Sequence, residues 1–101
     1  MDLSQEEWKR LLESDDNAIL LDVRTTEEFE EGHIPGATLL DIRQAGDFMK
    51  EIQSMDTCKN YYVYCRSGSR SAQACKIMGQ IGIPTTYNLL GGFMEWDGAS
   101  K

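Results

Sequence analysis

Residues 61–70 read YYVYCRSGSR, and they give the clearest indication of the fold class. The first four residues are aromatic or β-branched, a composition typical of a strand. From Arg70 onward, apolar residues recur at helical spacing until Gly82, which predicts a helix that ends there. Between the two, residues 65–70 hold only cysteine, arginine, serine and glycine. A strand that leads through a short polar loop into a helix is the unit from which α/β domains are built.

The same alternation continues on both sides of this stretch. A short apolar run predicts a buried strand at residues 18–23, and two further short strands are predicted at residues 38–40 and 85–89. Amphipathic stretches predict helices, which begin near the capping residues Ser4, Thr26 and Asp47, and a short last helix with Phe93 and Trp96. Strands that alternate with helices indicate an α/β domain whose central sheet is mainly parallel.

Size and charge limit the possible functions. The 101 residues fit a single domain over 1–101. The net charge of −7 argues against nucleic-acid binding and against adsorption to an anionic membrane, since both need a basic surface. No run approaches the ~18 apolar residues of a membrane span, and the start of the chain lacks the basic and apolar stretches of a secretory signal. We therefore expect a cytoplasmic protein and, by default, a monomer.

The cysteine count points to one working thiol. Cys58, Cys65 and Cys75 are an odd number without a C-x-x-C spacing, which suggests neither a disulfide framework nor a zinc site. His33 is the only histidine, so a metal centre would lack its commonest ligand, and we expect no metal. A reduced compartment explains this cysteine usage better. Of the three, only Cys65 shares a loop with two arginines.

The loop that begins at Cys65 has the composition of an anion site. Ligand sites of open α/β sheets lie at the carboxyl ends of strands, where this loop is predicted. The small residues Ser67 to Ser69 allow backbone N–H groups to point inward, and the next helix adds its positive N-terminal end. Arg66 and Arg70 supply positive charge. All of these favour the thiolate of Cys65, which is the nucleophile. A cysteine after a strand is more often an inert small hydrophobe, but an inert residue would not need this polar loop.

Three parts of the chain resemble the rhodanese domain family. Cys65–Arg70 is similar to the six-residue active-site loop of that family. Leu21–Arg24, Glu28–Phe29 and Gly32–Ala37 are similar to its N-terminal signature, and Leu90–Trp96 is similar to its C-terminal signature. Together these parts span nearly the whole chain in the right order. The resemblance implies a rhodanese-like three-layer α/β domain, with a mainly parallel central sheet and helices on both faces.

The resemblance also implies a sulfurtransferase in which Cys65 carries sulfane sulfur as a persulfide. The anion site would be the loop that follows, through its backbone amides and its arginine side chains: Arg66, Ser67, Gly68, Ser69 and Arg70. The donor would be thiosulfate, with sulfite as the leaving group, or a persulfide or polysulfide. The acceptor would be cyanide or a thiol, such as glutathione, thioredoxin or a sulfur-carrier protein. No metal or organic cofactor is needed.

Residues outside the loop have simpler interpretations. His33 lies in a Gly-x-x-Pro-Gly turn, which favours an orienting hydrogen bond over a role as general base. Asp22 and Arg24 stand at a strand end, where a structural ion pair or a helix cap is more common than a catalytic role. Cys75 falls within a predicted helix and is expected to be packed away, with a resolving thiol as the alternative. Cys58 is expected to be exposed.

Two other functions stay open. Phosphatases and arsenate reductases pair a cysteine with an arginine across a similar loop, but with one more residue between them than the four that separate Cys65 from Arg70. The shorter loop suits a single sulfur better than a phosphate. The second alternative is a non-catalytic binding module, since a fold alone does not fix an activity. Modules of that kind often lack the cysteine or the arginines, and this chain retains both.

Overall fold

Strands and helices alternate along residues 1–101, all of which are described in this computed structural model. The strands are β1 Asp2–Leu3, β2 Ala18–Asp22, β3 Thr38–Leu39, β4 Asn60–Tyr64 and β5 Thr86–Leu89. The helices are α1 Gln5–Glu13, α2 Thr26–Glu31, α3 Ala45–Gln53, α4 Ser69–Gln80 and a 3-10 helix at Phe93–Glu95. None of them combines the length and the apolar character that would carry a helix across a bilayer.

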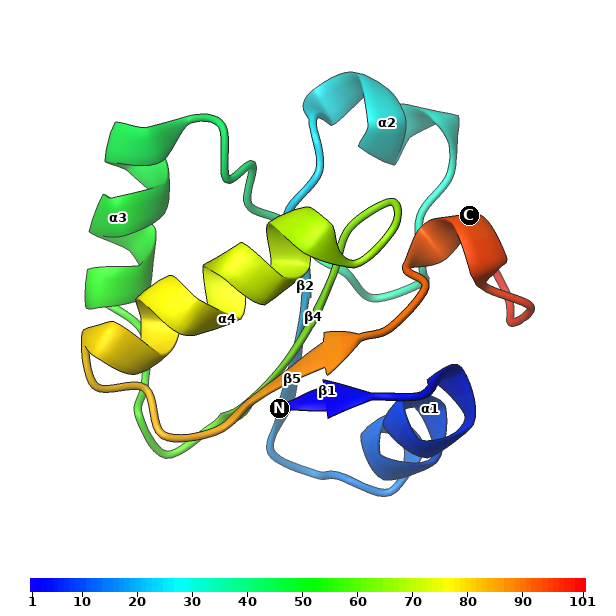
Figure 1. The fold of residues 1–101 in the computed structure, drawn as a ribbon, viewed down its shortest axis with the longest axis horizontal. Helices are drawn as coiled ribbons and strands as arrows, with labels where there is room; N and C mark the ends of the chain where they lie inside the picture. Colours follow the sequence, from blue (N-terminus) through cyan, green and yellow to red (C-terminus); the bar gives the residue numbers. More distant parts are fainter.

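One sheet contains all five strands, in the order β1-β5-β4-β2-β3 (Figure 1). Every neighbouring pair is parallel. The α/β class with a parallel central sheet is therefore confirmed. The strand predicted from its aromatic run, β4, lies in the middle of the sheet, between β5 and β2. β2 and β4 end level with each other, because Asp22 pairs with Tyr64. The segments that follow these two strands therefore emerge at the same edge.

Side chains of β4 alternate between two separate cores. Tyr61 and Val63 point to one face, where they pack with Phe48 of α3 and Met78 of α4 in a cluster that also holds Cys65. Tyr62 and Tyr64 point to the opposite face, where Trp8 of α1 is completely buried against them in edge-on contacts. Figure 1 shows α3 and α4 on one side of the strands and α1 with the C-terminal turn on the other. The predicted three-layer arrangement is confirmed.

The predicted helix starts need two corrections. The side chain of Ser4 caps α1 as expected, since it accepts a hydrogen bond from the amide of Glu7. The cap of α2 is Thr25 rather than Thr26, and it forms a reciprocal capping box with Glu28. Asp47 does not cap α3, which already begins at Ala45. It lies in the first turn instead, where the positive end of the helix dipole still favours its carboxylate.

The reason for the early start of α3 lies just before it. The side chain of Asp41 accepts a hydrogen bond from the amide of Arg43, and its carbonyl accepts one from the amide of Gln44. This turn delivers the chain into helical geometry at once, so the amide of Phe48 already donates to the carbonyl of Gln44 at 2.8 Å. The two-residue strand β1, which pairs with β5, is also absent from the sequence prediction. Two residues are too short for a periodic pattern.

Candidate active site

The loop between β4 and α4 holds the candidate nucleophile. β4 ends at Tyr64, Cys65 follows directly, and α4 begins at Ser69, so the predicted order of strand, loop and helix is confirmed. Gly68 precedes the helix with φ +105°, a left-handed backbone conformation that residues other than glycine rarely adopt. This conformation turns the chain back on itself. The amide of Gly68 points at the Cys65 sulfur and donates a hydrogen bond to it at 3.1 Å.

The Cys65 side chain is fully buried, and its surroundings act on the pKa of its thiol in opposite directions. Burial is the largest influence and would raise the pKa of the thiol. Hydrogen bonds act in the other direction: from the Ser71 hydroxyl and amide, and from the amides of Gly68 and Ser67. Together they outweigh burial, and the pKa of Cys65 lies below its ordinary value of 9.0. The site therefore favours the thiolate more than an ordinary protein interior does.

The two arginines of the loop have different surroundings. Arg66 is exposed, and its guanidinium makes no hydrogen bond or ion pair within the chain. Arg70 forms a two-pronged ion pair with Glu28 of α2, with N–O distances of 2.7 and 2.9 Å. The hydrogen bonds from Arg70 lower the pKa of Glu28 to about 2, against the opposing effect of burial. The charge of Arg70 is thus already balanced, whereas Arg66 is free to meet an anion.

The C-terminal stretch supports the loop through backbone contacts. The amide of Phe93 donates to the carbonyl of Cys65 at 2.8 Å, and the amide of Met94 donates to the carbonyl of Arg66 at 2.9 Å. Gly92 lies directly beneath, with φ +62°. A Cβ atom there would stand 2.6 Å from the Cys65 carbonyl oxygen and closer still to that of Arg66. Only glycine therefore allows this segment to hold the loop from below.

A buried ion pair ties the N-terminal stretch to the same place. Arg24 and Asp22 are both buried, and the Arg24 guanidinium contacts the Asp22 carboxylate at 2.6 Å. The same guanidinium donates to the carbonyl of Gly32 at 2.7 Å and lies 4.6 Å from the centre of the Phe93 ring. The prediction of a structural ion pair is confirmed. It connects the segment after β2, the end of α2 and the C-terminal stretch.

The remaining candidates lie where the sequence predicted them. His33 has its Nδ1 atom 3.0 Å from the carbonyl oxygen of Phe29 and stacks on the Phe29 ring, as an orienting role requires. Cys75 is buried and Cys58 is exposed.

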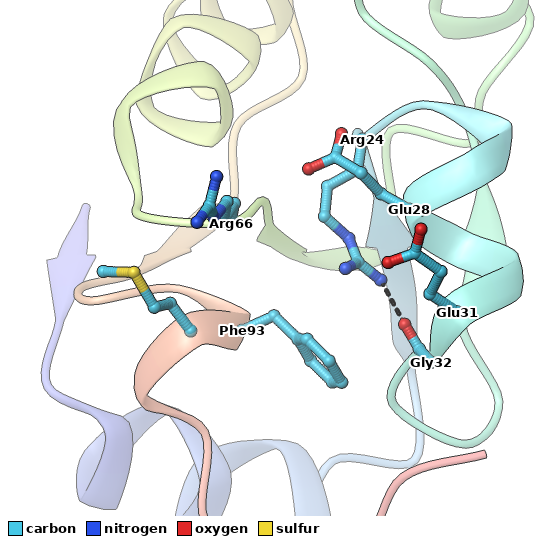
Figure 2. A pocket seen from close by; sticks show the side chains of 7 residues that line it. Arg24, Glu28, Glu31, Gly32, Arg66 and Phe93 are labelled. Carbon is cyan, nitrogen blue, oxygen red and sulfur yellow. Dashed lines mark hydrogen bonds between the residues drawn. The ribbon is translucent and has the colours of Figure 1, made fainter.

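A cavity of about 430 Å³ opens beside the loop (Figure 2). It lies between α2, the loop and the C-terminal turn, and its lining is mixed in charge: Arg24, Glu28, Glu31, Gly32, Arg66, Phe93 and Met94. Figure 2 shows Arg66 across the cavity from the carboxylates of α2. Cys65 is not among the lining residues, and its side chain is fully buried.

Sequence reasoning missed three polar partners of the loop. Glu28 meets Arg70 from 42 positions away, which no local spacing reveals. Ser71 and Asn88 are both buried, and the Ser71 hydroxyl bridges the Cys65 sulfur and the Asn88 side chain. The available signal for Asn88 was an amide in the interior of a predicted strand, since such a group needs hydrogen-bond partners when it is buried.

Comparison with known proteins agrees with the fold. The rhodanese-like domain family matches residues 4–99. The YtwF protein of Bacillus subtilis (strain 168) is 37% identical over 100 residues, which cover 99% of this chain and 93% of that protein. Thiosulfate sulfurtransferase GlpE of Pseudomonas syringae pv. syringae (strain B728a) is 35% identical over 79 residues, which cover 78% of this chain and 72% of that enzyme.

Solved structures agree with the fold as well. The crystal structure of a rhodanese-like domain protein from Staphylococcus aureus superposes with a TM-score of 0.79 at 28% sequence identity, covering 94% of this chain and 89% of that one. The names of YtwF and GlpE both contain the word sulfurtransferase, which supports a role in sulfur transfer. From its family match, its relatives and its architecture, the chain belongs to the rhodanese-like domain family.

Proposed function

We propose that this protein is a sulfurtransferase that carries sulfane sulfur as a persulfide on Cys65. One observation carries the proposal: the Cys65 sulfur lies at the carboxyl end of the central strand, accepts the Gly68 amide, and has a lowered pKa despite full burial. A buried thiol without these donors would be inert, since burial alone raises its pKa.

The first step loads the cysteine. The Cys65 thiolate attacks the outer sulfur of thiosulfate and forms a new S–S bond, while the S–S bond of thiosulfate breaks and its electron pair leaves with sulfite. The negative charge then resides on the outer sulfur of the persulfide. Inward-pointing amides of residues 66–70 would stabilise that charge, and the free guanidinium of Arg66 would attract the donor. We expect Arg70 to contribute less attraction, because Glu28 balances its charge.

The second step removes the sulfur from Cys65. An acceptor thiolate attacks the outer sulfur, and the electron pair of the broken S–S bond returns to Cys65 as its thiolate. No metal or organic cofactor takes part. Glutathione, thioredoxin or the cysteine of a sulfur-carrier protein would supply the required thiol. A persulfide or polysulfide would serve as donor in the same way. We further propose that the protein acts as a monomer in the cytoplasm.

Burial of Cys65 restricts what can react. Arg66, Ser67 and Ser69 of the loop that follows are exposed, so solvent reaches this loop although it does not reach the sulfur. We expect that a slender terminal sulfur reaches Cys65 with only a small displacement of the loop. Phosphatases have one more residue between the cysteine and the arginine, which lets their loop wrap a tetrahedral oxyanion, whereas four residues separate Cys65 from Arg70. The shorter loop therefore favours sulfur transfer over phosphate-ester hydrolysis.

Intact-protein mass spectrometry tests the proposal. After incubation with thiosulfate, the protein should gain the mass of one sulfur atom, and cyanide should remove it. Cys65→Ser should abolish the gain, whereas the matched variant Cys58→Ser, which removes the exposed thiol, should retain it. No gain from thiosulfate, polysulfide or glutathione persulfide, or faster hydrolysis of phosphate esters than sulfur transfer, would contradict the proposal.

A further inference from the structure

A buried chain of polar groups runs from the candidate nucleophile into the sheet. The Cys65 sulfur and the Ser71 hydroxyl of α4 are 3.4 Å apart. The Ser71 hydroxyl is in turn in close contact with Oδ1 of Asn88, on β5. All three side chains are almost completely buried. Water is therefore not available to supply or remove a proton along the chain, and each hydrogen bond in it has a defined direction.

The orientation of the Asn88 amide is determined by its neighbours. Its Nδ2 lies 3.0 Å from the Asp2 carboxylate and 3.2 Å from the Gly68 carbonyl oxygen. Both of these groups are acceptors only, and the two N–H bonds of Nδ2 serve one each. A reversed amide would place its oxygen against two other oxygens. The amide oxygen therefore faces Ser71, where it can only accept.

The Ser71 hydroxyl has a single proton to donate. While Cys65 is a neutral thiol, this proton lies between Ser71 and Asn88, since the Asn88 oxygen can only accept, and Ser71 presents lone pairs to the Cys65 sulfur. A hydrogen bond from the Ser71 hydroxyl to the sulfur belongs to the thiolate state. A neutral Cys65 thiol can donate into those lone pairs, but a thiolate cannot. For Ser71 to stabilise the thiolate, its hydroxyl must turn away from Asn88 and leave the buried amide oxygen without a partner, which is costly.

We propose that Asn88 is a positioning residue that holds the Ser71 proton away from the Cys65 sulfur and thereby sets how readily Cys65 ionises. The proposal deepens the proposed function, on which its catalytic meaning rests. A thiolate of very low basicity is a weak nucleophile, and the most reactive thiol has a pKa near the working pH. The Gly68 amide promotes ionisation, whereas Asn88 restrains it. The two together keep the sulfur both ionised and nucleophilic.

Other charged groups around the sulfur do not pass through this chain. Arg70 and Cys75, both of α4, interact electrostatically with Cys65, and the Arg70 charge is balanced by Glu28. Asp2 contacts Asn88 from β1 and is exposed to solvent. A substitution at position 88 leaves all of these charges in place, so it isolates the effect of the amide oxygen.

Asn88→Leu is the decisive variant, because leucine has the same branched shape without polar atoms. The Gly68 carbonyl would keep its hydrogen bond from the Ala72 amide at 3.1 Å, and the exposed Asp2 would turn to water. The Ser71 hydroxyl would then have only the Cys65 sulfur as its acceptor. The pH midpoint of Cys65 alkylation by iodoacetamide, followed residue by residue with mass spectrometry, should fall by about one unit, the value of one charge-assisted hydrogen bond.

The double variant Ser71→Ala/Asn88→Leu separates this mechanism from a general loosening of the loop. Without the hydroxyl, Asn88→Leu should no longer lower the midpoint. An upward shift in Asn88→Leu, or an equal downward shift in the Ser71→Ala background, would overturn the proposal. Ser71→Ala alone gives a second test that does not depend on folding of Asn88→Leu. It should move the midpoint by much less than one unit, and a rise of one unit would also overturn the proposal.

Alkylation needs no sulfur donor or acceptor, so the outcome is distinguishable from a failure of the proposed function. A shifted midpoint in a protein that never accepts sulfur would uphold the role of Asn88 and refute the sulfurtransferase. Normal persulfide formation with an unchanged midpoint in Asn88→Leu would uphold the sulfurtransferase and refute the role of Asn88.

Discussion

Arg66 and Arg70 carry the same charge, but only one of them is free to use it. Arg66 is exposed and unpaired, whereas Arg70 is paired with Glu28. We expect Arg66→Ala to raise the KM for thiosulfate about tenfold, the effect of losing one charge-assisted contact. Its urea midpoint should stay close to that of the parent protein, since the side chain is exposed. Steady-state kinetics measures the change, and Arg10→Ala, which removes an exposed arginine of α1, is the matched control. An equal rise in KM in both variants would show that only net charge matters.

Glu28 gives the protein a specific sensitivity to acid. Its pKa is about 2 in the folded chain, against an ordinary value of 4.5, chiefly because of its hydrogen bonds with Arg70. A lowered pKa in the folded state means that the stabilisation is complete above pH 4.5 and is lost as the pH falls toward 2. The difference in urea midpoint between the parent protein and Glu28→Gln should therefore shrink over this interval. Glu27→Gln, at the exposed neighbouring position, should show no such trend. A difference for Glu28→Gln that does not depend on pH would contradict the assignment.

Among the elements, the turn before the C-terminal 3-10 helix has the least freedom to vary. Gly92 combines φ +62° with a contact to the backbone of Cys65 and Arg66 that leaves no room for a Cβ atom. We expect Gly92→Ala to push the loop away from its support, and so to abolish persulfide formation and lower the urea midpoint. Gly46→Ala in α3 is the matched control, since a Cβ atom there meets nothing within 4 Å. That control should gain about 0.5–1 kcal/mol, because alanine favours a helix over glycine. Persulfide formation in Gly92→Ala at the parent level would show that the support is dispensable.

At the level of the whole molecule, the sequence predicted the layers better than the contacts between them. The aromatic and β-branched run of β4 and the helical spacing after Arg70 were sufficient for a parallel α/β sheet, because each depends on residues close in the chain. The cap of α3 was misplaced, because the side-chain turn at Asp41 that starts the helix is a local signal that the prediction did not use. Asn88 and Ser71 are 17 positions apart and meet only after folding. The loop composition could therefore indicate Cys65 as the candidate nucleophile, but it could not indicate the groups that surround its sulfur.

The two cores of the domain share one strand, and this sharing should make their unfolding cooperative. β4 contributes Tyr62 to the face that buries Trp8 and Val63 to the face that holds Cys75. Removing Trp8 should therefore also weaken the opposite face. We expect Trp8→Ala to destabilise the protein by about 3–5 kcal/mol, the usual cost of deleting a large buried aromatic side chain.

Two probes in Trp8→Ala report on the two faces during urea unfolding. The remaining Trp96 packs against the Trp8 face, and its fluorescence should change at the same urea concentration at which the buried Cys75 thiol becomes reactive. Coincident transitions are the mark of a two-state domain. Met94→Ala, at a residue 60% exposed, is the control and should change stability by less than about 0.5 kcal/mol. A Cys75 thiol that stays protected after the fluorescence transition is complete would mean that α3 and α4 hold their face of the sheet without the other, and that β4 does not couple the two cores.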